Sequence, residues 1–245
     1  MSSMSEEERP ADCTFATRIR RVRYETAAQE LAAPDGSWDM LFIWRHDQLL
    51  VLQTGQIATP VVAEWGAGDS VLSIAFRPEV YMPQLPGRMT AHQGVLRPLA
   101  GRQSFWVGND QLEVPSFDNA EQFIRQLASR GLIERDRVVR RALDGELQRL
   151  DDRTTQRHFA QVTGLSAKTF QQVLRAGNAV KRLETGETPA SVAADLGFTD
   201  QAHLTNSLKR IVGRTPGQIV RDSRPAPVNR EPNTPATPEN TAGDS

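Results

Sequence analysis

Residues 188–209, which read TPASVAADLGFTDQAHLTNSLK, decide how the C-terminal half of the chain folds. Thr188 can cap a helix whose first residue is the following proline, where a missing backbone N–H costs nothing. Gly197 can supply the left-handed backbone conformation that a tight turn between helices needs. Thr199 or Asp200 can cap the second helix. The segment therefore predicts a helix-turn-helix, in which about three residues join two helices at a steep angle.

The second helix of this motif has two chemically different faces. Its predicted inner face is apolar and consists of Leu204, Leu208, Ile211 and Val212. Its predicted outer face consists of Gln201, Ala202, Thr205, Asn206 and Lys209. Amide side chains can donate to and accept from base edges in the major groove, and a lysine can reach a phosphate. Similar turns also join helices in proteins that never touch DNA, so a purely structural interpretation stays open at this point.

Charge is distributed unevenly along the chain. The 245 residues carry a net charge of −1, but residues 134–224 hold 16 Lys and Arg against 11 Asp and Glu. A basic C-terminal segment joined to an acidic remainder fits a DNA-binding module attached to another domain. Ordinary scatter of surface charge is the alternative interpretation.

The changing sequence pattern predicts an α+β protein with two domains between polar ends. Residues 1–13 and the proline-rich residues 225–245 are expected to be disordered, because neither segment can bury enough apolar area. Residues 14–133 are expected to form an antiparallel sheet or small barrel, and residues 134–224 a helical DNA-binding domain. Strands are predicted at residues 38–44, 49–52, 61–65 and 71–76.

Signatures of catalysis and of metal binding are weak. The single cysteine, Cys13, excludes an internal disulfide and a cysteine-based zinc finger. The four histidines have no metal-ligand spacing, although His46 and His92 leave a cupin-like metal site open as a minor alternative. No nucleophile elbow or phosphate loop occurs, so we expect no enzyme, no cofactor and no metal. Without an apolar run of about 18 residues or a signal peptide, a cytoplasmic protein that does not contact the membrane is expected.

Residues 157–219 closely resemble the DNA-binding domain of the AraC/XylS family of bacterial transcription regulators. The resemblance is carried by Arg157-His158-Phe159, Thr163-Gly164-Leu165-Ser166, Arg175, Ala179, Leu183, Gly186, Val192-Ala193, Leu196-Gly197-Phe198, Asp200, His203-Leu204, Leu208-Lys209-Arg210 and Gly213-Arg214-Thr215-Pro216. In that family, two helix-turn-helix units flank one linker helix and enter successive major grooves on one face of the DNA. The resemblance implies a linker helix near Ala167–Leu183, binding to operator or promoter DNA, and RNA polymerase as a partner.

The same resemblance places the recognition helix of a first unit from about Asp151-Asp152 to Val162. Its residues toward DNA would be Arg153, Gln156 and Arg157, and an arginine can pair bidentately with guanine. However, residues 144–150 are short for the preceding helix, and Asn206 of the second unit stands where many members carry arginine. An alternative is therefore a degenerate helix-turn-helix protein that acts by protein–protein contacts without its own operator.

The N-terminal half is similar to the N-terminal domain of a subgroup of these regulators whose ligand is generally unassigned. This similarity is carried by Pro34–Asp39, Phe76-Arg77-Pro78, Phe105-Trp106 and residues 117–121. It implies a domain that senses a small-molecule effector or mediates homodimerisation. The four tryptophans of the chain all lie in this half, and burial in a core is the ordinary explanation. Trp44 and Trp106 are our candidates for the walls of an effector pocket.

Overall fold

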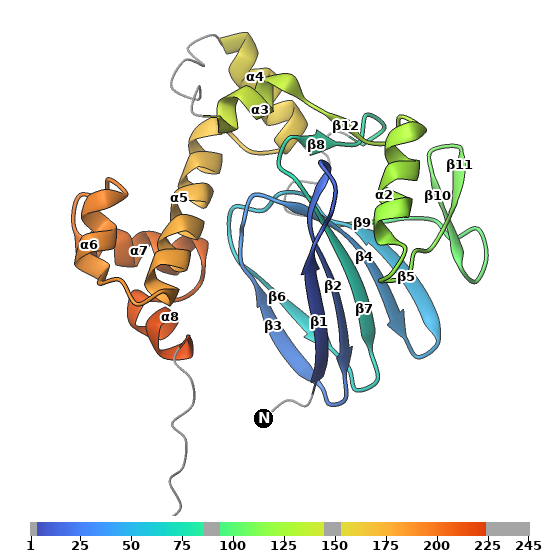
Figure 1. The fold of residues 1–245 in the computed structure, drawn as a ribbon, viewed down its shortest axis with the longest axis horizontal. Coiled ribbons are helices and arrows are strands. Elements are labelled where there is room, and N and C mark those ends of the chain that lie inside the picture. Colours follow the sequence, from blue (N-terminus) through green and yellow to red (C-terminus); the bar gives the residue numbers. More distant parts are fainter. Residues whose placement is uncertain (1–3, 86–93, 145–152, 224–245) are drawn as a thin grey trace, which may run out of the picture.

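A β-rich N-terminal region leads into a helical C-terminal region (Figure 1). The computed structural model describes residues 4–85, 94–144 and 153–223. The predicted α+β class is confirmed within these ranges. The proline-rich tail, residues 225–245, lies outside them.

The main sheet has six antiparallel strands in the order β1-β2-β7-β4-β5-β9. These strands are β1 (Met4–Pro10), β2 (Ala16–Tyr24), β7 (Ser70–Phe76), β4 (Trp38–Arg45), β5 (Gln48–Gln53) and β9 (Val95–Leu96). The tight turn between β4 and β5 is made by His46 and Asp47, whose φ angles are 48° and 61°. The strands predicted at residues 38–44 and 49–52 therefore pair as a hairpin.

Three two-stranded sheets complete the β structure. They pair β3 (Ala28–Ala32) with β6 (Val61–Trp65), β8 (Val80–Tyr81) with β12 (Glu134–Arg135), and β10 (Ser104–Val107) with β11 (Asp110–Glu113). The strand predicted at residues 61–65 is β6, which belongs to a separate two-stranded sheet rather than to the main sheet. Because β12 pairs with β8, the predicted domain boundary at 133/134 lies beside a strand that contacts the N-terminal domain.

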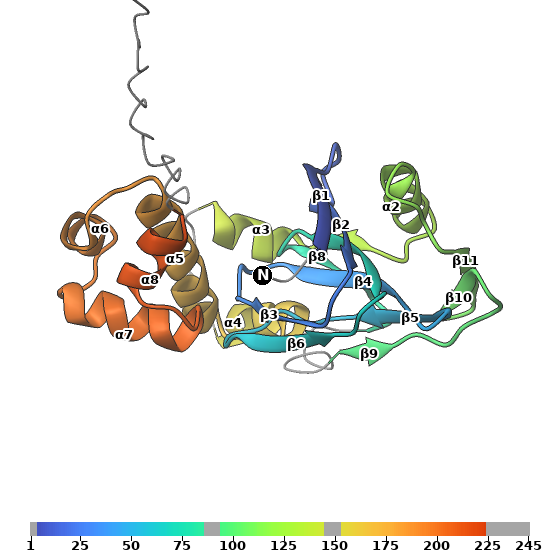
Figure 2. The same cartoon turned by 90° about the horizontal axis from the view of Figure 1, so that it is seen from below.

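The principal core lies between the main sheet and helix α2 (Ala120–Ser129), which covers one face of the sheet (Figure 2). Met40 and Phe42 alternate toward this face and are fully buried. Phe42 makes edge-on contacts with Phe105 and Phe123, at centroid distances of 5.6 and 5.8 Å. The alternation of apolar residues along β4 therefore serves core packing, which was the favoured interpretation of its aromatic side chains.

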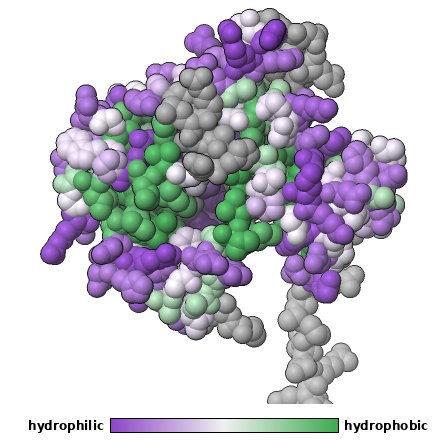
Figure 3. Space-filling view, turned by 180° about the vertical axis from the view of Figure 1, so that it is seen from behind, coloured by the Kyte–Doolittle hydropathy of each residue, from purple (hydrophilic) through white to green (hydrophobic). Residues whose placement is uncertain are grey.

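The opposite face of the main sheet is only partly covered. The two-stranded β3–β6 sheet covers the β2 side, where Glu30 accepts hydrogen bonds of 2.6 Å from Arg20 and from the Tyr24 hydroxyl. Trp65 of β6 stacks on Tyr24 with ring centroids 5.2 Å apart. Strand register places Leu41, Ile43, Leu50, Leu52 and Leu96 on the remainder of this face. This set, the back surface, forms part of a hydrophobic area seen from behind, and Leu96 is 61% exposed (Figure 3).

Residues 1–13 were expected to be disordered, and for β1 this expectation is wrong. Glu6 and Glu7 of β1 form ion pairs with Arg20 and Arg21 of β2, at 2.6 and 2.8 Å. The strand also pairs with β2 along its whole length. Complementary charge and backbone pairing order this polar strand, although it buries little apolar area.

Six helices follow β12 in the described part of the chain. They are α3 (Arg137–Leu143), α4 (Arg153–Thr163), α5 (Ala167–Glu184), α6 (Pro189–Asp195), α7 (Gln201–Ile211) and α8 (Pro216–Asp222). One small core joins α3, α4 and the start of α5 around Phe159 and Phe170. A second core joins the rest of α5 with α6, α7 and α8 around Leu204 and Leu208. The long helix α5 occupies the place predicted for the linker helix.

The predicted turn between α6 and α7 is present. Thr188 caps α6 by accepting a hydrogen bond from the Ser191 backbone N–H, and Asp200 is the residue that caps α7. Gly197 adopts a φ of +71°. A β-carbon at this glycine would meet no atom within 4 Å, so the requirement for glycine comes from the backbone conformation and not from crowding.

Asp39 is a buried carboxylate on the sheet face that includes the back surface. Its carboxylate accepts a hydrogen bond from the Ser73 hydroxyl at 3.1 Å. Burial, with a smaller effect from the nearby Asp35 carboxylate, raises the pKa of Asp39 to about 6. The folded protein therefore holds this proton more tightly than the unfolded chain does, and ionisation of Asp39 opposes folding.

We expect Asp39→Asn to raise the free energy of unfolding by about 1–3 kcal/mol at about pH 7.5, because the variant has no buried charge. The gain should shrink as the pH falls from about 6 toward the ordinary aspartate value of 3.8, and it should be lost below 3.8, where the wild-type carboxylate is protonated in both states. Urea unfolding at neutral and acidic pH measures this difference. Glu113→Gln, at an exposed carboxylate of β11, is the control. A gain that does not depend on pH would contradict the prediction.

Gly197→Val should destabilise the second core by about 2 kcal/mol, since a β-branched residue resists the left-handed region. Gly197→Asn should cost less, because asparagine tolerates this conformation. Thermal unfolding of the two variants beside the wild type tests the prediction. Equal melting temperatures for all three proteins would show that the turn does not need this conformation.

Candidate nucleic-acid interface

The second helix-turn-helix unit presents one polar face. The predicted inner residues Leu204, Leu208, Ile211 and Val212 are all buried. Of the predicted outer residues, Gln201, Ala202, Asn206 and Lys209 are exposed, and Thr205 is half-buried. The Thr205 hydroxyl donates to the Gln201 carbonyl at 2.9 Å, so it is engaged within the helix. Their spacing along α7 places the five outer residues on one side of the helix.

A residue of α5 supports the turn of the second unit. The Arg175 guanidinium lies 4.6 Å from the centre of the Phe198 ring and donates to the Gly197 carbonyl at 3.4 Å. Phe198 in turn meets the His203 ring edge-on at 5.4 Å. This support was not predicted, because Arg175 and Gly197 are distant in sequence and helical periodicity does not report contacts between helices.

The first unit also exposes its predicted polar residues. Phe159 and Val162 of α4 are buried, and Thr155 on the same side of the helix is half-buried. The exposed residues Arg153, Gln156 and Arg157 line an open hollow of about 530 Å³ together with Thr154 and Ser166. Residues 145–152, which include the predicted start of this recognition helix, lie outside the described ranges.

Positive charge and a helix terminus meet at this hollow. Ser166 caps α5, and its hydroxyl accepts from the Thr169 backbone N–H at 3.1 Å. The N-terminus of an α-helix carries partial positive charge, which adds to that of Arg153 and Arg157. The hollow can therefore attract phosphate oxygens, while Gln156 can bond to a base edge.

The two candidate effector residues are not brought together by any described cavity. Trp44 is partly buried against the principal core, whereas Trp106 is 37% exposed on β10. Neither residue lines the hollow at α4 or the smaller cavity beside Trp38. A pocket walled by these tryptophans stays a prediction.

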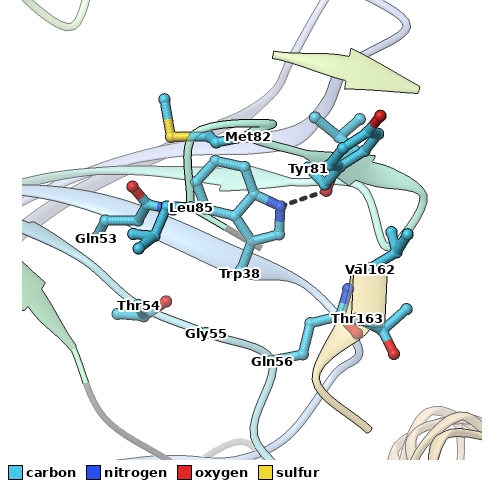
Figure 4. A pocket seen from close by; sticks show the side chains of 11 residues that line it. Trp38, Gln53, Thr54, Gly55, Gln56, Tyr81, Met82, Leu85, Val162 and Thr163 are labelled. Atoms are coloured by element: carbon cyan, nitrogen blue, oxygen red, sulfur yellow. Dashed lines mark hydrogen bonds between the residues drawn. The ribbon is translucent and has the colours of Figure 1, made fainter. Parts of the chain in front are cut away.

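A small cavity lies where the N-terminal domain meets α4 (Figure 4). Trp38, Gln56 and Tyr81 line it from one side and Val162 and Thr163 from the other. Its volume of about 10 Å³ has room for one water molecule. Beside it, Trp38 donates from Nε1 to the Val80 carbonyl at 2.7 Å.

Neither a metal cluster nor a membrane-spanning helix is found among the described residues. Within residues 4–85, 94–144 and 153–223, no group of three or more His, Cys, Asp or Glu side chains is placed to hold a metal ion. His46 lies in the β4–β5 turn, and His92 lies outside the described ranges. None of the helices in the same ranges combines the length and apolarity that crossing a bilayer requires.

Comparisons with known proteins bear on the helical region. The chain is similar in structure to ToxT from Vibrio cholerae, with 11% sequence identity, a TM-score of 0.41, and coverage of 90% of this chain and 98% of that one. No curated protein matches the sequence. A family model described as a helix-turn-helix domain matches residues 149–222, which contain all of α4 to α8. Residues 149–222 are therefore a helix-turn-helix domain, as the resemblance to AraC/XylS regulators implied.

Proposed function

We propose that the chain regulates transcription by binding a specific double-stranded DNA site through the outer faces of α4 and α7. The observation that carries this proposal is the face of α7, which combines two amides and a lysine within the matched helix-turn-helix domain. Gln201 and Asn206 have the chemistry to bond to base edges, and Lys209 to bond to a phosphate.

The first unit supports the same function. Arg153, Gln156 and Arg157 are exposed together on α4, and the shared helix α5 joins this unit to the second one. Two units on one linker helix would contact two segments of the same DNA face. The absence of symmetry between the two helix faces favours a non-palindromic site.

For the N-terminal domain, we propose regulation through a small-molecule effector or through homodimerisation. The partly exposed back surface supports either role, because contiguous apolar area on a protein surface commonly marks an interaction site. Trp44 and Trp106 remain the proposed effector contacts, and RNA polymerase remains the proposed protein partner. A regulator of this kind acts in the cytoplasm and needs no enzymatic activity.

Selection from a random double-stranded DNA library with the full chain should recover a defined site. Footprinting should show two protected segments about one helical turn apart. Affinity should fall steeply with salt, because each neutralised phosphate releases counterions. Each such phosphate makes the slope of log affinity against log salt concentration more negative by about 0.9. Selection of no preferred sequence at moderate salt would favour the alternative, a degenerate domain that acts through protein contacts.

Single substitutions on the two recognition helices should have different signatures. Gln201→Ala and Arg153→Ala should each relax the choice of base at one position and cost roughly 1–3 kcal/mol of binding. Lys209→Ala should weaken all sequences alike and reduce the salt slope by about one. Binding measured on single-base variants of the selected site distinguishes these results. Gln122→Ala, at an exposed amide of α2 in the N-terminal domain, is the matched control and should change neither quantity.

A further inference from the structure

The apolar contacts of α4 lie on one side of the helix. Phe159 is fully buried and meets Phe170 of α5 edge-on, with ring centroids 5.5 Å apart. Val162, one turn further along, is 8% exposed. Apolar packing of this kind holds the buried side of α4 against its neighbours but has little directionality, so a polar contact would add precision to the rotation of the helix about its axis.

His158 adds a directional contact. In the sequence it lies between Arg157, which lines the hollow, and the buried Phe159. Its Nε2 atom lies 2.7 Å from Oδ2 of Asp136, whose side chain is 9% exposed. A hydrogen bond depends on angle as well as distance, and this one is made outside the apolar core. Rotation of α4 that would carry Arg153 and Arg157 away from their present face would break it.

Asp136 is itself fixed at three further points. Its Oδ1 atom accepts from the backbone N–H groups of Val138 and Val139, at 2.9 and 2.8 Å, and so caps α3. Its own backbone N–H donates to the Glu79 carbonyl at 2.7 Å. Glu79 belongs to the N-terminal domain, is 5% exposed, and forms an ion pair of 2.7 Å with Arg135. The partner of His158 is therefore anchored to the N-terminal domain.

The second recognition helix has no matching hydrogen-bonded connection within the described part of the chain, although Leu31 and Pro60 of the N-terminal domain lie close to Gly213 just beyond its end. His203 of α7 uses Nδ1 to accept from the Thr199 backbone N–H at 3.2 Å, inside its own turn. Arg210 donates to Gln172 of α5 at 3.0 Å. The side-chain hydrogen bonds found for α7 thus end within the helical domain, whereas α4 is connected to the N-terminal domain through Asp136.

We propose that Asp136 and His158 are positioning residues for DNA recognition, which hold α4 at the rotation where Arg153, Gln156 and Arg157 reach the DNA. Neither residue contacts DNA in this role. The contact also makes the first unit responsive to the N-terminal domain, because a shift of the Glu79 segment would move the partner of His158. This inference rests on the proposed function.

The test uses the full chain and DNA fragments selected by the wild-type protein. His158→Leu removes the polar contact at similar volume, whereas His158→Gln retains an amide donor that can reach the carboxylate. Asp136→Ser keeps a good capping residue for α3 but is too short to reach His158. Arg153→Ala identifies the DNA segment that belongs to α4, since its protection in the footprint should weaken in that variant.

We expect His158→Leu and Asp136→Ser to lose protection of the α4 segment and to bind about tenfold more weakly, the effect of losing one good base contact. Protection of the α7 segment should persist, and His158→Gln should restore most of the affinity. Without DNA, hydrogen exchange of α4 amides should accelerate in His158→Leu and Asp136→Ser, while exchange in α7 stays unchanged.

Two results would overturn this inference without affecting the proposed function. They are unchanged footprints in His158→Leu, or equal weakening of both segments together with a lower melting temperature. Unchanged footprints would show that the contact does not position α4. Equal weakening with a lower melting temperature would show that the contact serves folding only. If the wild-type chain selects no DNA sequence at all, the proposed function fails and this inference fails with it.

Discussion

The inner face of α5 belongs to two hydrophobic cores, and the arrangement of both helix-turn-helix units depends on it. Phe170 packs into the core of the first unit, whereas Val173, Ala176, Ala179 and Leu183 pack into the core of the second. All five side chains are fully buried. The helix has 18 residues and so spans about 27 Å, close to the ~34 Å between successive major grooves. A continuous helix with a shared apolar stripe therefore sets the distance between the two helix faces that we propose contact DNA.

The N-terminal domain sits against this same helix. A β-carbon at Gly36 would come within 3.2 Å of the Phe170 ring and 3.3 Å of Leu174. The segment that leads into β4 therefore packs closely on α5. Ala58 and Tyr81 pack against the core of the first unit. Movement in the sheet would therefore reach α5 and α4 directly through these contacts.

The features that could be predicted from sequence are those that depend on neighbours along the chain. The caps at Thr188 and Asp200, the glycine turn between them and the buried face of α7 follow from local spacing and confirm the second unit. Strand β1 was missed because its polar composition alone predicts disorder. The ion pairs that its glutamates form with arginines of β2 cannot be seen in the composition. The contacts of Arg175 with Phe198 and of Asp136 with His158 join separate helices or loops, which no periodicity reports. Trp44 and Trp106 share aromatic character but lie on different sheets, so residue type was a poor guide to proximity.

The acidic edge of the main sheet has a consequence for the behaviour of the protein in concentrated solution. The outer side of β1 carries unpaired backbone groups, and such an edge is a template on which another chain can add a strand. The consecutive residues Glu6, Glu7 and Glu8 are all exposed along it. Charged side chains along an edge strand disfavour the addition of another strand, even though Glu6 and Glu7 are paired with Arg20 and Arg21 of β2. Any self-association of the N-terminal domain is thereby steered away from β1 and toward the apolar residues around β5 and β9.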